Sequence, residues 1–395
     1  MSKAVVTDSK PYRLCTVAAA GYRSLRQIGF AIDQLSVFVG ANGVGKTNLY
    51  RTLQLVQAAA AGTLAQELAG EGGMASAMSA AKRLPKSPSL ITLKAGFKMG
   101  RATICSYEVS AGFASYTEGE IRKRVGAAFL DEPQIKVESL TIDTGARKVK
   151  LLDRQGPATF MRNAEGVREI MSDELMPSET ALGSFEDPSR FPDLYWLRRN
   201  ILDWRFYHNL RTDQTSPLRQ PCLAVTSPTL SSDGGNLAAV FATLVHIRED
   251  TVALDRAIDD AFPGAQLTVP EPGRTASFGL VFPEYPKRIF EVGELSDGTL
   301  RYLALAGALL SYRLPSFVAL NEPETSLHPS LLKPLARLIF DASKRSQIWL
   351  VTHSQQLAEA IASQANITPR TVIKRDGETW IEGLKMTGEF SDPDD

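Results

Sequence analysis

The chain has 395 residues and a mass of 43.0 kDa, which allows one large domain or two modest ones with a well-buried core. Its 44 Lys and Arg residues balance 44 Asp and Glu residues, so no overall basic field indicates nucleic acid, and such binding would need a local patch. Cys15, Cys105 and Cys222 are scattered without Cys-x-x-Cys spacing, which argues against a disulfide framework or a thiolate zinc site.

Targeting and membrane signals are weak in this sequence. Residues 1–16 carry charged and polar side chains throughout and lack the apolar core of a secretory signal. The apolar run at residues 303–310 is too short to span a bilayer. We therefore expect a cytoplasmic protein that has no membrane partner.

The first part of the chain predicts a strand, a glycine-rich turn, a helix and then a meander. Residues 35–39 are an apolar run, and residues 46–60 have the spacing of a helix. Residues 58–81 indicate a helix interrupted by a loop at 70–73. An antiparallel meander is predicted by four strand-like segments, at residues 90–97, 102–109, 135–142 and 148–152.

Helical patterns return in the middle of the chain, and the last third alternates helix and strand. Leu194, Leu197 and Ile201 form an apolar stripe, and residues 237–247 and 252–262 are also helical in pattern. A largely parallel sheet covered by helices is predicted by the order helix 300–313, strand 317–320, helix 331–343, strand 348–351 and helix 355–364. Residues 372–381 indicate a hairpin that turns at Asp376 and Gly377. The sequence has no sustained heptad repeat, so we do not expect long coiled-coil arms.

The glycine-rich turn after residues 35–39 fits the Gly-x-x-x-x-Gly-Lys-Thr pattern of a phosphate-binding P-loop. Its members are Gly40, Ala41, Asn42, Gly43, Val44, Gly45, Lys46 and Thr47, and Asn48 follows in the helix. Glycines let successive backbone N–H groups curl around a phosphate at the positive end of the helix. We expect Lys46 to reach the β- and γ-phosphates of ATP and the Thr47 hydroxyl to ligate Mg²⁺.

A second polar cluster follows the apolar strand at residues 316–320. Asn321 stands where a Walker B motif usually has Asp, and its amide oxygen could hold a metal-bound water without adding a charge. Glu322 comes next and is the candidate general base that orients and activates the attacking water.

Two further motifs lie at the ends of predicted elements. Ser296, Asp297 and Gly298 open a helix, where a hydroxyl and bare N–H groups suit a phosphate. Taken alone, this motif is typical of an ordinary helix cap. Its place just before the Glu322 strand favours the phosphate-binding interpretation. His353 follows an apolar strand, at a place where it could contact the γ-phosphate or the attacking water.

Taken in order, these motifs resemble the ATP-binding-cassette head family, and more narrowly the AAA-type ATPases that are similar to RecF and the SMC proteins. The resemblance covers nearly the whole chain and is carried by the ordered segments 22–25, 40–43, 295–299, 321–329 and 352–354. It implies an α/β P-loop NTPase, an ABC-type head with a mixed central sheet, an antiparallel β meander and a helical insertion. The expected parts are 1–60 with the P-loop, 61–160 with the meander, 161–285 as a mostly helical insertion and 286–395 with the signature, Walker B and switch-histidine motifs.

The resemblance also implies how two chains would share ATP. Ser296 and Gly298 of one subunit would complete the site that holds Lys46 and Glu322 of the other, so a homodimer would bury two ATP molecules. ATP binding would drive closure and hydrolysis would release it. Residues 326–329 resemble the loop that crosses the dimer interface, and Arg23 matches a position near the nucleotide base.

The sequence departs from the family pattern at two places, and two biological roles stay open. Asn321 puts the hydrolysis rate in doubt, and no Gln between Gln66 and Gln134 offers the coupling residue of a Q-loop. The resemblance to RecF favours an ATP-hydrolysing switch in DNA repair or recombination, with DNA as a partner. A regulatory ATPase subunit for a separate protein effector, such as a nuclease in phage defence, is the alternative. A transporter motor is disfavoured because the meander and the Ser296 motif suit SMC-like heads better.

Overall fold

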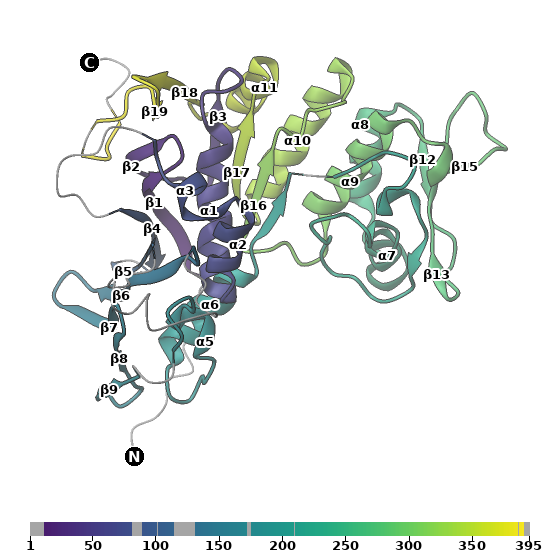
Figure 1. The fold of residues 1–395 in the computed structure, drawn as a ribbon. Helices are drawn as coiled ribbons and strands as arrows, with labels where there is room; N and C mark the ends of the chain where they lie inside the picture. The colour runs from purple at the N-terminus through teal and green to yellow at the C-terminus, as the bar shows by residue number, and fades with distance from the viewer. Residues whose placement is uncertain are drawn as a thin grey trace. The chain divides into compact units, whose positions relative to one another are not determined.

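The structure is a computed structural model, and it describes residues 12–80, 89–100, 102–113, 131–171, 175–208, 210–385 and 387–390. Most of residues 1–16, which we expected to lack a secretory signal, lie outside these residues. The chain divides into two compact units. Figure 1 labels their helices and strands. The first contains Met1–Asp33, Gly43–Asp203 and Val372–Asp395, and the second contains Gln34–Asn42 and Trp204–Thr371.

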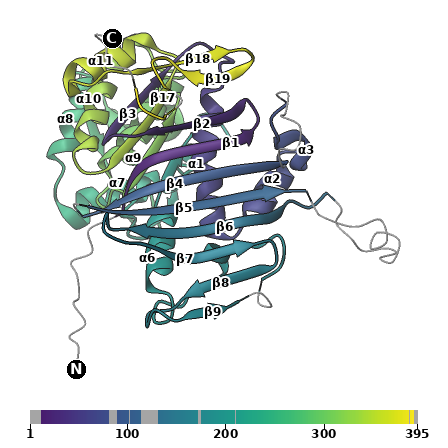
Figure 2. The same cartoon turned by 90° about the vertical axis from the view of Figure 1, so that its left-hand side faces the viewer.

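An eight-stranded antiparallel sheet organises the first unit, in the order β2-β1-β4-β5-β6-β7-β8-β9 (Figure 2). The predicted meander is confirmed as β4 to β7, and strands that were not predicted extend it at both edges. The bounds are β1 Arg13–Tyr22, β2 Leu25–Ala31, β4 Leu90–Met99, β5 Thr103–Gly112, β6 Gln134–Asp143, β7 Lys148–Gln155, β8 Ala158–Arg162 and β9 Arg168–Ile170.

Alternation along the strands gives this sheet a buried face. In β4, Ile91, Leu93, Ala95 and Phe97 are buried, because side chains two residues apart point to the same side of a strand. Helix α1 packs on β4, helices α2, α5 and α6 pack against α1, and α3 packs against α2. The helices are α1 Lys46–Ala61, α2 Leu64–Gly70, α3 Gly73–Ala77, α5 Ala181–Ser184 and α6 Pro192–Leu202.

One buried ion pair holds a loop against this sheet. The Glu138 carboxylate accepts the Tyr107 hydroxyl at 2.9 Å and the backbone N–H groups of Ala181 and Leu182 at 2.6 and 2.9 Å. Arg154 lies 3.9 Å from Glu138 and donates to backbone carbonyls of the same loop, and both side chains are almost fully buried. Removal of either charge would leave the other uncompensated in the interior.

A parallel sheet organises the second unit, in the order β10-β16-β17-β3. These strands are nearly continuous hydrophobic runs, as expected for a parallel sheet buried on both faces. The strands are β10 Arg205–Tyr207, β16 Phe317–Asn321, β17 Gln347–Thr352 and β3 Leu35–Val39. On the other side of β3, the first two residues of β18 Arg370–Arg375 pair in parallel.

The predicted C-terminal hairpin is confirmed in the first unit. The remaining residues of β18 pair antiparallel with β19 Glu378–Ile381. Asp376 and Gly377 have φ angles of 52° and 85°, which is the left-handed backbone that a two-residue hairpin turn requires.

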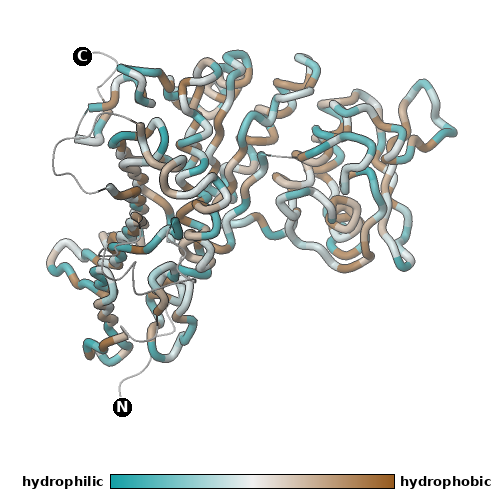
Figure 3. The backbone as a smooth tube through the Cα atoms, in the orientation of Figure 1, coloured by the Kyte–Doolittle hydropathy of each residue, from teal (hydrophilic) through white to brown (hydrophobic). Residues whose placement is uncertain are grey.

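Helices of the second unit follow the predicted alternation, with boundaries shifted by a few residues. Hydrophobic residues, brown in Figure 3, recur along these elements. The helices are α7 Leu237–Ala242, which continues as the π-helix η3 Thr243–Arg248, α8 Val252–Ala261, α9 Asp297–Leu310, α10 Leu332–Ser343 and α11 Gln355–Ala365. None of the helices in the described part of the chain has the length and apolar character to cross a membrane.

The stretch 161–285, which we expected to be mostly helical, holds short strands as well as helices. One small sheet has β12 Gln266–Thr268, β14 Gly279–Val281 and β15 Phe290–Glu291, and another pairs β11 Cys222–Leu223 with β13 Thr275–Ala276. Single-turn helices η2 Pro217–Arg219, η4 Val292–Glu294 and η5 Pro329–Leu331 complete the unit. Strands of two or three residues carry too little alternation to be predicted.

Candidate functional site

The P-loop sequence connects β3 to α1, as predicted. Strand β3 ends at Val39, and α1 begins at Lys46 with no acidic side chain in its first turn. Gly43 and Gly45 have φ angles of 80° and 97°, so both use the left-handed backbone that glycine adopts without strain. The Lys46 residue is buried, whereas Thr47 is exposed.

A chain of hydrogen bonds in the first unit supports the P-loop backbone. Asn48 Nδ2 donates to Ser24 Oγ at 2.6 Å, and Ser24 Oγ lies 2.6 Å from Thr379 Oγ1. The Thr379 hydroxyl in turn donates to the carbonyl of Val44 at 2.8 Å. A Cβ on Gly45 would lie 1.8 Å from Thr379 Oγ1, so only glycine fits beside this contact. The C-terminal hairpin therefore sets the shape of the P-loop.

Arg23, which we expected near the nucleotide base, lies in an acidic setting in the first unit. Its guanidinium is 2.7 Å from Glu71, which also pairs with Arg51 at 2.6 Å and accepts the Tyr22 hydroxyl at 2.9 Å. The Arg23 backbone has a φ of 47°, and its N–H donates to the carbonyl of Ala77. Glu71 thus fixes both arginines within one network.

Three of the predicted motifs meet at one edge of the parallel sheet in the second unit. Val39 is the register partner of Thr352, and Asn321 is the partner of Val351. The residues that follow these strands, namely Gly40, His353 and Glu322, therefore leave the sheet at the same edge. Ligands bind outside the carboxyl ends of strands in open α/β sheets, so this is the edge where a ligand is expected.

Glu322 has a constrained backbone and a half-exposed side chain. Its φ of 49° is rare for a residue other than glycine. The conformation is held because its N–H donates to the Val351 carbonyl at 2.7 Å and Arg301 donates to its carbonyl at 3.3 Å. Its carboxylate lies 3.9 Å from His353 Nδ1, and the Glu322 side chain is 33% exposed. The two predicted catalytic side chains are therefore neighbours.

Glu324 is a buried carboxylate behind this pair. Its Oε1 accepts the Thr352 hydroxyl at 2.5 Å and the backbone N–H groups of His353 and Ser354 at 3.0 and 3.2 Å. The same oxygen is 3.1 Å from His353 Nδ1, and the Glu324 side chain is only 5% exposed. Glu324 thus fixes the turn after β17 and stands beside the His353 ring.

The Ser296 motif forms the start of α9. Ser296 is the N-cap, and its Oγ accepts the Thr299 N–H at 3.2 Å. This is the ordinary helix cap that was the alternative to a phosphate site. A Cβ on Gly298 would lie 3.0 Å from the Ser326 carbonyl, so the helix start packs closely on the loop after Glu322. Asp297 pairs with Arg219 at 2.7 Å.

Comparison with known families bears on these residues directly. Residues 179–359 match the family described as "AAA domain, putative AbiEii toxin, Type IV TA system". This part of the chain, rather less than half of it, is therefore similar to AAA-type ATPase domains. The match includes the Ser296 motif, Asn321, Glu322 and His353, while the P-loop and Arg23 precede the matched residues.

Other comparisons concern curated and solved proteins. No curated protein matches this chain. The SMC head domain from Thermotoga maritima is 14% identical over 93% of this chain and 98% of that chain, with a TM-score of 0.47. An SMC head bound to the C-winged helix domain of ScpA is 16% identical over 95% and 99%, with a TM-score of 0.49. An SMC head from Pyrococcus furiosus bound to the C-terminal domain of ScpA is 15% identical over 94% and 96%, with a TM-score of 0.46.

Sequence reasoning missed three residues that shape this candidate site. Glu324 stands two positions after Glu322, and a second carboxylate so near a candidate base was the available signal. Thr379 and Arg301 had no such signal, because each acts on a backbone carbonyl that is distant in sequence.

Proposed function

We propose that this chain is an ATP-driven molecular switch, which binds MgATP at the P-loop, closes as a homodimer and reopens on hydrolysis. The observation that carries this proposal is the 3.9 Å approach of Glu322 and His353 at the sheet edge where the P-loop begins. The AAA family match supports the ATPase chemistry. A carboxylate and an imidazole at a phosphate-binding edge are the groups that hydrolysis of a phosphoanhydride needs.

In this mechanism the chain positions the phosphates and removes one proton. P-loop N–H groups and Lys46 hold the β- and γ-phosphates. Glu322 accepts a proton as the water oxygen bonds to the γ-phosphorus, and the bond to the bridging oxygen breaks so that ADP leaves with the electron pair. His353 holds the water or the γ-phosphate by hydrogen bonding, and Glu324 fixes the turn that carries His353.

Mg²⁺ is the metal that this P-loop motif implies, and the available donors fit it. Thr47 is an exposed residue, and Asn321 Oδ1 is buried without a hydrogen-bond partner among the residues that the structure describes. A buried oxygen of this kind is costly unless a donor, such as a metal-bound water, reaches it. When bound, Mg²⁺ would neutralise charge on the phosphates. Asn321 brings no charge, so we expect weaker metal binding than with Asp.

The homodimer would complete each ATP site in trans. Ser296 and Gly298 of one subunit would contact the γ-phosphate held by Lys46 of the other, with residues 326–329 at the interface. The exposed Ser296 hydroxyl and the positive end of α9 support this proposal. Such an interface would be isologous and closed by a twofold axis.

The proposed biological role is a switch in DNA repair or recombination, by the resemblance to RecF. A second role is favoured by the description of the matched family, which names a toxin of a type IV toxin–antitoxin system. In that case the ATPase would regulate a protein effector. A pull-down with the Glu322→Gln protein and ATP separates the two: retained nucleic acid supports the first role, and a retained protein without nucleic acid supports the second.

The experiment that tests the proposed chemistry is the steady-state ATPase rate of Glu322→Gln. Loss of a general base should lower turnover by about 10²–10⁴-fold. ATP binding should persist, because the P-loop is unchanged. Normal turnover in this variant would remove Glu322 from the mechanism.

A further inference from the structure

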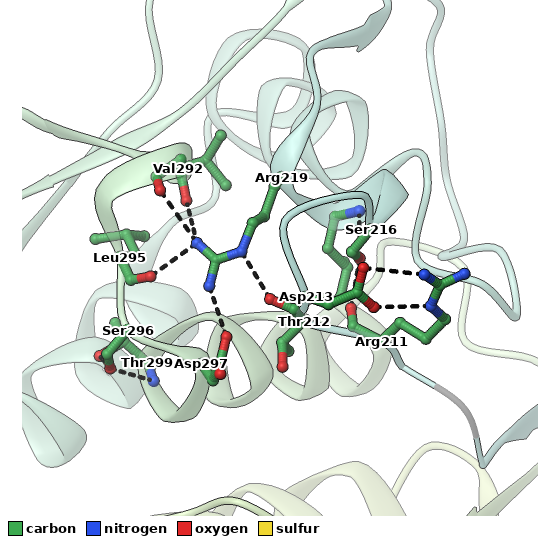
Figure 4. Close-up of polar contacts among 12 residues, drawn as sticks. Arg211, Thr212, Asp213, Ser216, Arg219, Val292, Leu295, Ser296, Asp297 and Thr299 are labelled. Carbon is green, nitrogen blue, oxygen red and sulfur yellow. Dashed lines mark hydrogen bonds and ion pairs between the residues drawn. The ribbon is translucent and has the colours of Figure 1, made fainter.

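Arg219 lies at the centre of a hydrogen-bond cluster on the signature loop, defined here as residues 292–297 (Figure 4). Its Nη1 lies within hydrogen-bond distance of three backbone carbonyls, those of Val292 at 3.3 Å, Gly293 at 3.2 Å and Leu295 at 2.8 Å. Its Nη2 donates to the Asp297 carboxylate at 2.7 Å. One guanidinium therefore contacts the backbone on the N-terminal side of Ser296 and the side chain on its C-terminal side.

Arg219 is itself held in place by its own loop. It ends η2, and its Nε donates to the Thr212 carbonyl at 2.7 Å. Ser216, the N-cap of η2, is fully buried; its Oγ accepts the Leu218 N–H at 3.1 Å and donates to the Arg211 carbonyl at 2.5 Å. The Arg219 side chain is 10% exposed, so its contacts are largely shielded from water.

These contacts favour the conformation of the signature loop that the structure describes. Three consecutive or near-consecutive carbonyls point toward a single donor group, an arrangement that would be unfavourable without a cation between them. Hydrogen bonds to a charged donor stabilise proteins more than neutral ones do. A lysine could not replace this residue, because an ammonium lacks the planar fork that spans several acceptors.

The Asp297 contact has an electrostatic consequence for Ser296. Asp297 is in the first turn of α9, and its side chain is 61% exposed. An unpaired carboxylate there would repel a phosphate that approached the same helix end. Arg219 balances that charge at 2.7 Å while leaving the Ser296 hydroxyl exposed.

We infer that Arg219 is a positioning residue for the signature loop, which holds Ser296 in the conformation that receives the partner subunit's ATP and cancels the charge of Asp297. The part that concerns ATP rests on the proposed function. Arg219 is not a catalytic residue, since its side chain is engaged by this loop and by Thr212. The inference links the segment 211–219 to the shape of the ATP-binding interface.

The first test measures loop order without nucleotide, so it does not depend on dimerisation. In Arg219→Met, backbone amides of residues 293–299 should exchange with deuterium about 10-fold faster or more, as expected for loss of charged hydrogen bonds. Arg337→Met is the matched control, because Arg337 is 52% exposed and pairs with Asp260, outside both the signature loop and the segment 211–219. Equal exchange in Arg219→Met and wild type would overturn the inference.

The second test measures ATP-dependent dimerisation in the Glu322→Gln background. Arg219→Met should raise the protein concentration for half-dimerisation about 10-fold or more, while ATP affinity of the monomer changes less than about 3-fold. Adding Asp297→Asn should recover part of the loss, because the repelling charge is removed. If Glu322→Gln alone does not dimerise, the proposed function fails, and the exchange result still decides the positioning role.

If Arg219→Met does not fold, Asp297→Asn alone should speed exchange at residues 296–299, and unchanged exchange would contradict the inference.

Discussion

The Thr379 hydroxyl donates to the carbonyl of Val44 at 2.8 Å, which ties the last hairpin of the chain to the P-loop. Thr379 is buried, and its N–H donates to the Ser24 carbonyl at 2.9 Å. With Val44 bonded in this way and Asn48 bonded to Ser24, the loop is preorganised before a phosphate arrives. The hairpin is therefore part of the proposed nucleotide site, although Thr379 lies 335 residues from Val44 in the sequence.

Thr379→Val should weaken ATP binding. The substitution keeps the shape of the side chain but removes a buried donor, at a cost of about 1–2 kcal/mol, which is about 5–30-fold in affinity. Titration of the protein with a fluorescent ATP analogue would measure the change. Thr379→Ser keeps the hydroxyl and is the matched control. Equal losses in both variants would point to packing rather than to the hydrogen bond.

Gly45→Ala should damage the P-loop more than Gly43→Ala. Both positions have positive φ, so both variants incur about 1–2 kcal/mol of backbone strain. At Gly45 the new methyl would also collide with Thr379 Oγ1, whereas at Gly43 no atom lies within 4 Å of it. Thermal unfolding and ATP titration of the two proteins measure the difference. A Gly43→Ala protein that is equally impaired would contradict the steric part of this argument.

Glu324→Ala should lower both stability and turnover. It leaves the buried Thr352 hydroxyl and two backbone N–H groups without their acceptor, at a cost of about 1–3 kcal/mol for each group that water cannot reach. Glu324→Gln keeps an acceptor oxygen and removes only the charge beside His353. We expect its melting temperature to stay closer to that of the wild type while its ATPase rate falls. Wild-type turnover in Glu324→Ala would show that hydrolysis does not depend on the turn after β17 that Glu324 holds.

Asn321→Asp should strengthen Mg²⁺ dependence. A carboxylate at this position adds one anionic neighbour to the metal, and we expect the Mg²⁺ concentration for half-maximal turnover to fall about 10-fold, or about 1.4 kcal/mol. ATPase rates across a Mg²⁺ titration would show the shift. An unchanged titration curve would mean that the amide already serves the metal as well as a carboxylate does.

Much of the fold could be predicted because its signals are local. The hairpin turn depends on Asp376 and Gly377, and the parallel strands are apolar runs that end in polar residues. The P-loop and the Glu322 edge were predicted for the same reason, since strand ends in a parallel sheet meet at one side.

The remaining features depend on contacts between distant residues. Ser24 meets Thr379 across 355 positions, and Arg219 reaches the signature loop across more than seventy. Neither the residue types nor their spacing in a single sequence predicts such a contact. The short strands of the 161–285 stretch were missed because two or three residues form a strand only when a partner strand is present.

The central claim is that ATP closes two chains around a shared site, and the mass of Glu322→Gln in solution tests it most directly. Light scattering after gel filtration should give 43.0 kDa without nucleotide and twice that mass with MgATP. Glu322→Gln combined with Ser296→Arg should bind ATP yet remain a monomer, because the arginine would obstruct the partner's phosphate. A Glu322→Gln protein that stays monomeric with bound ATP, or an ATP-dependent dimer of the double variant, would contradict the account.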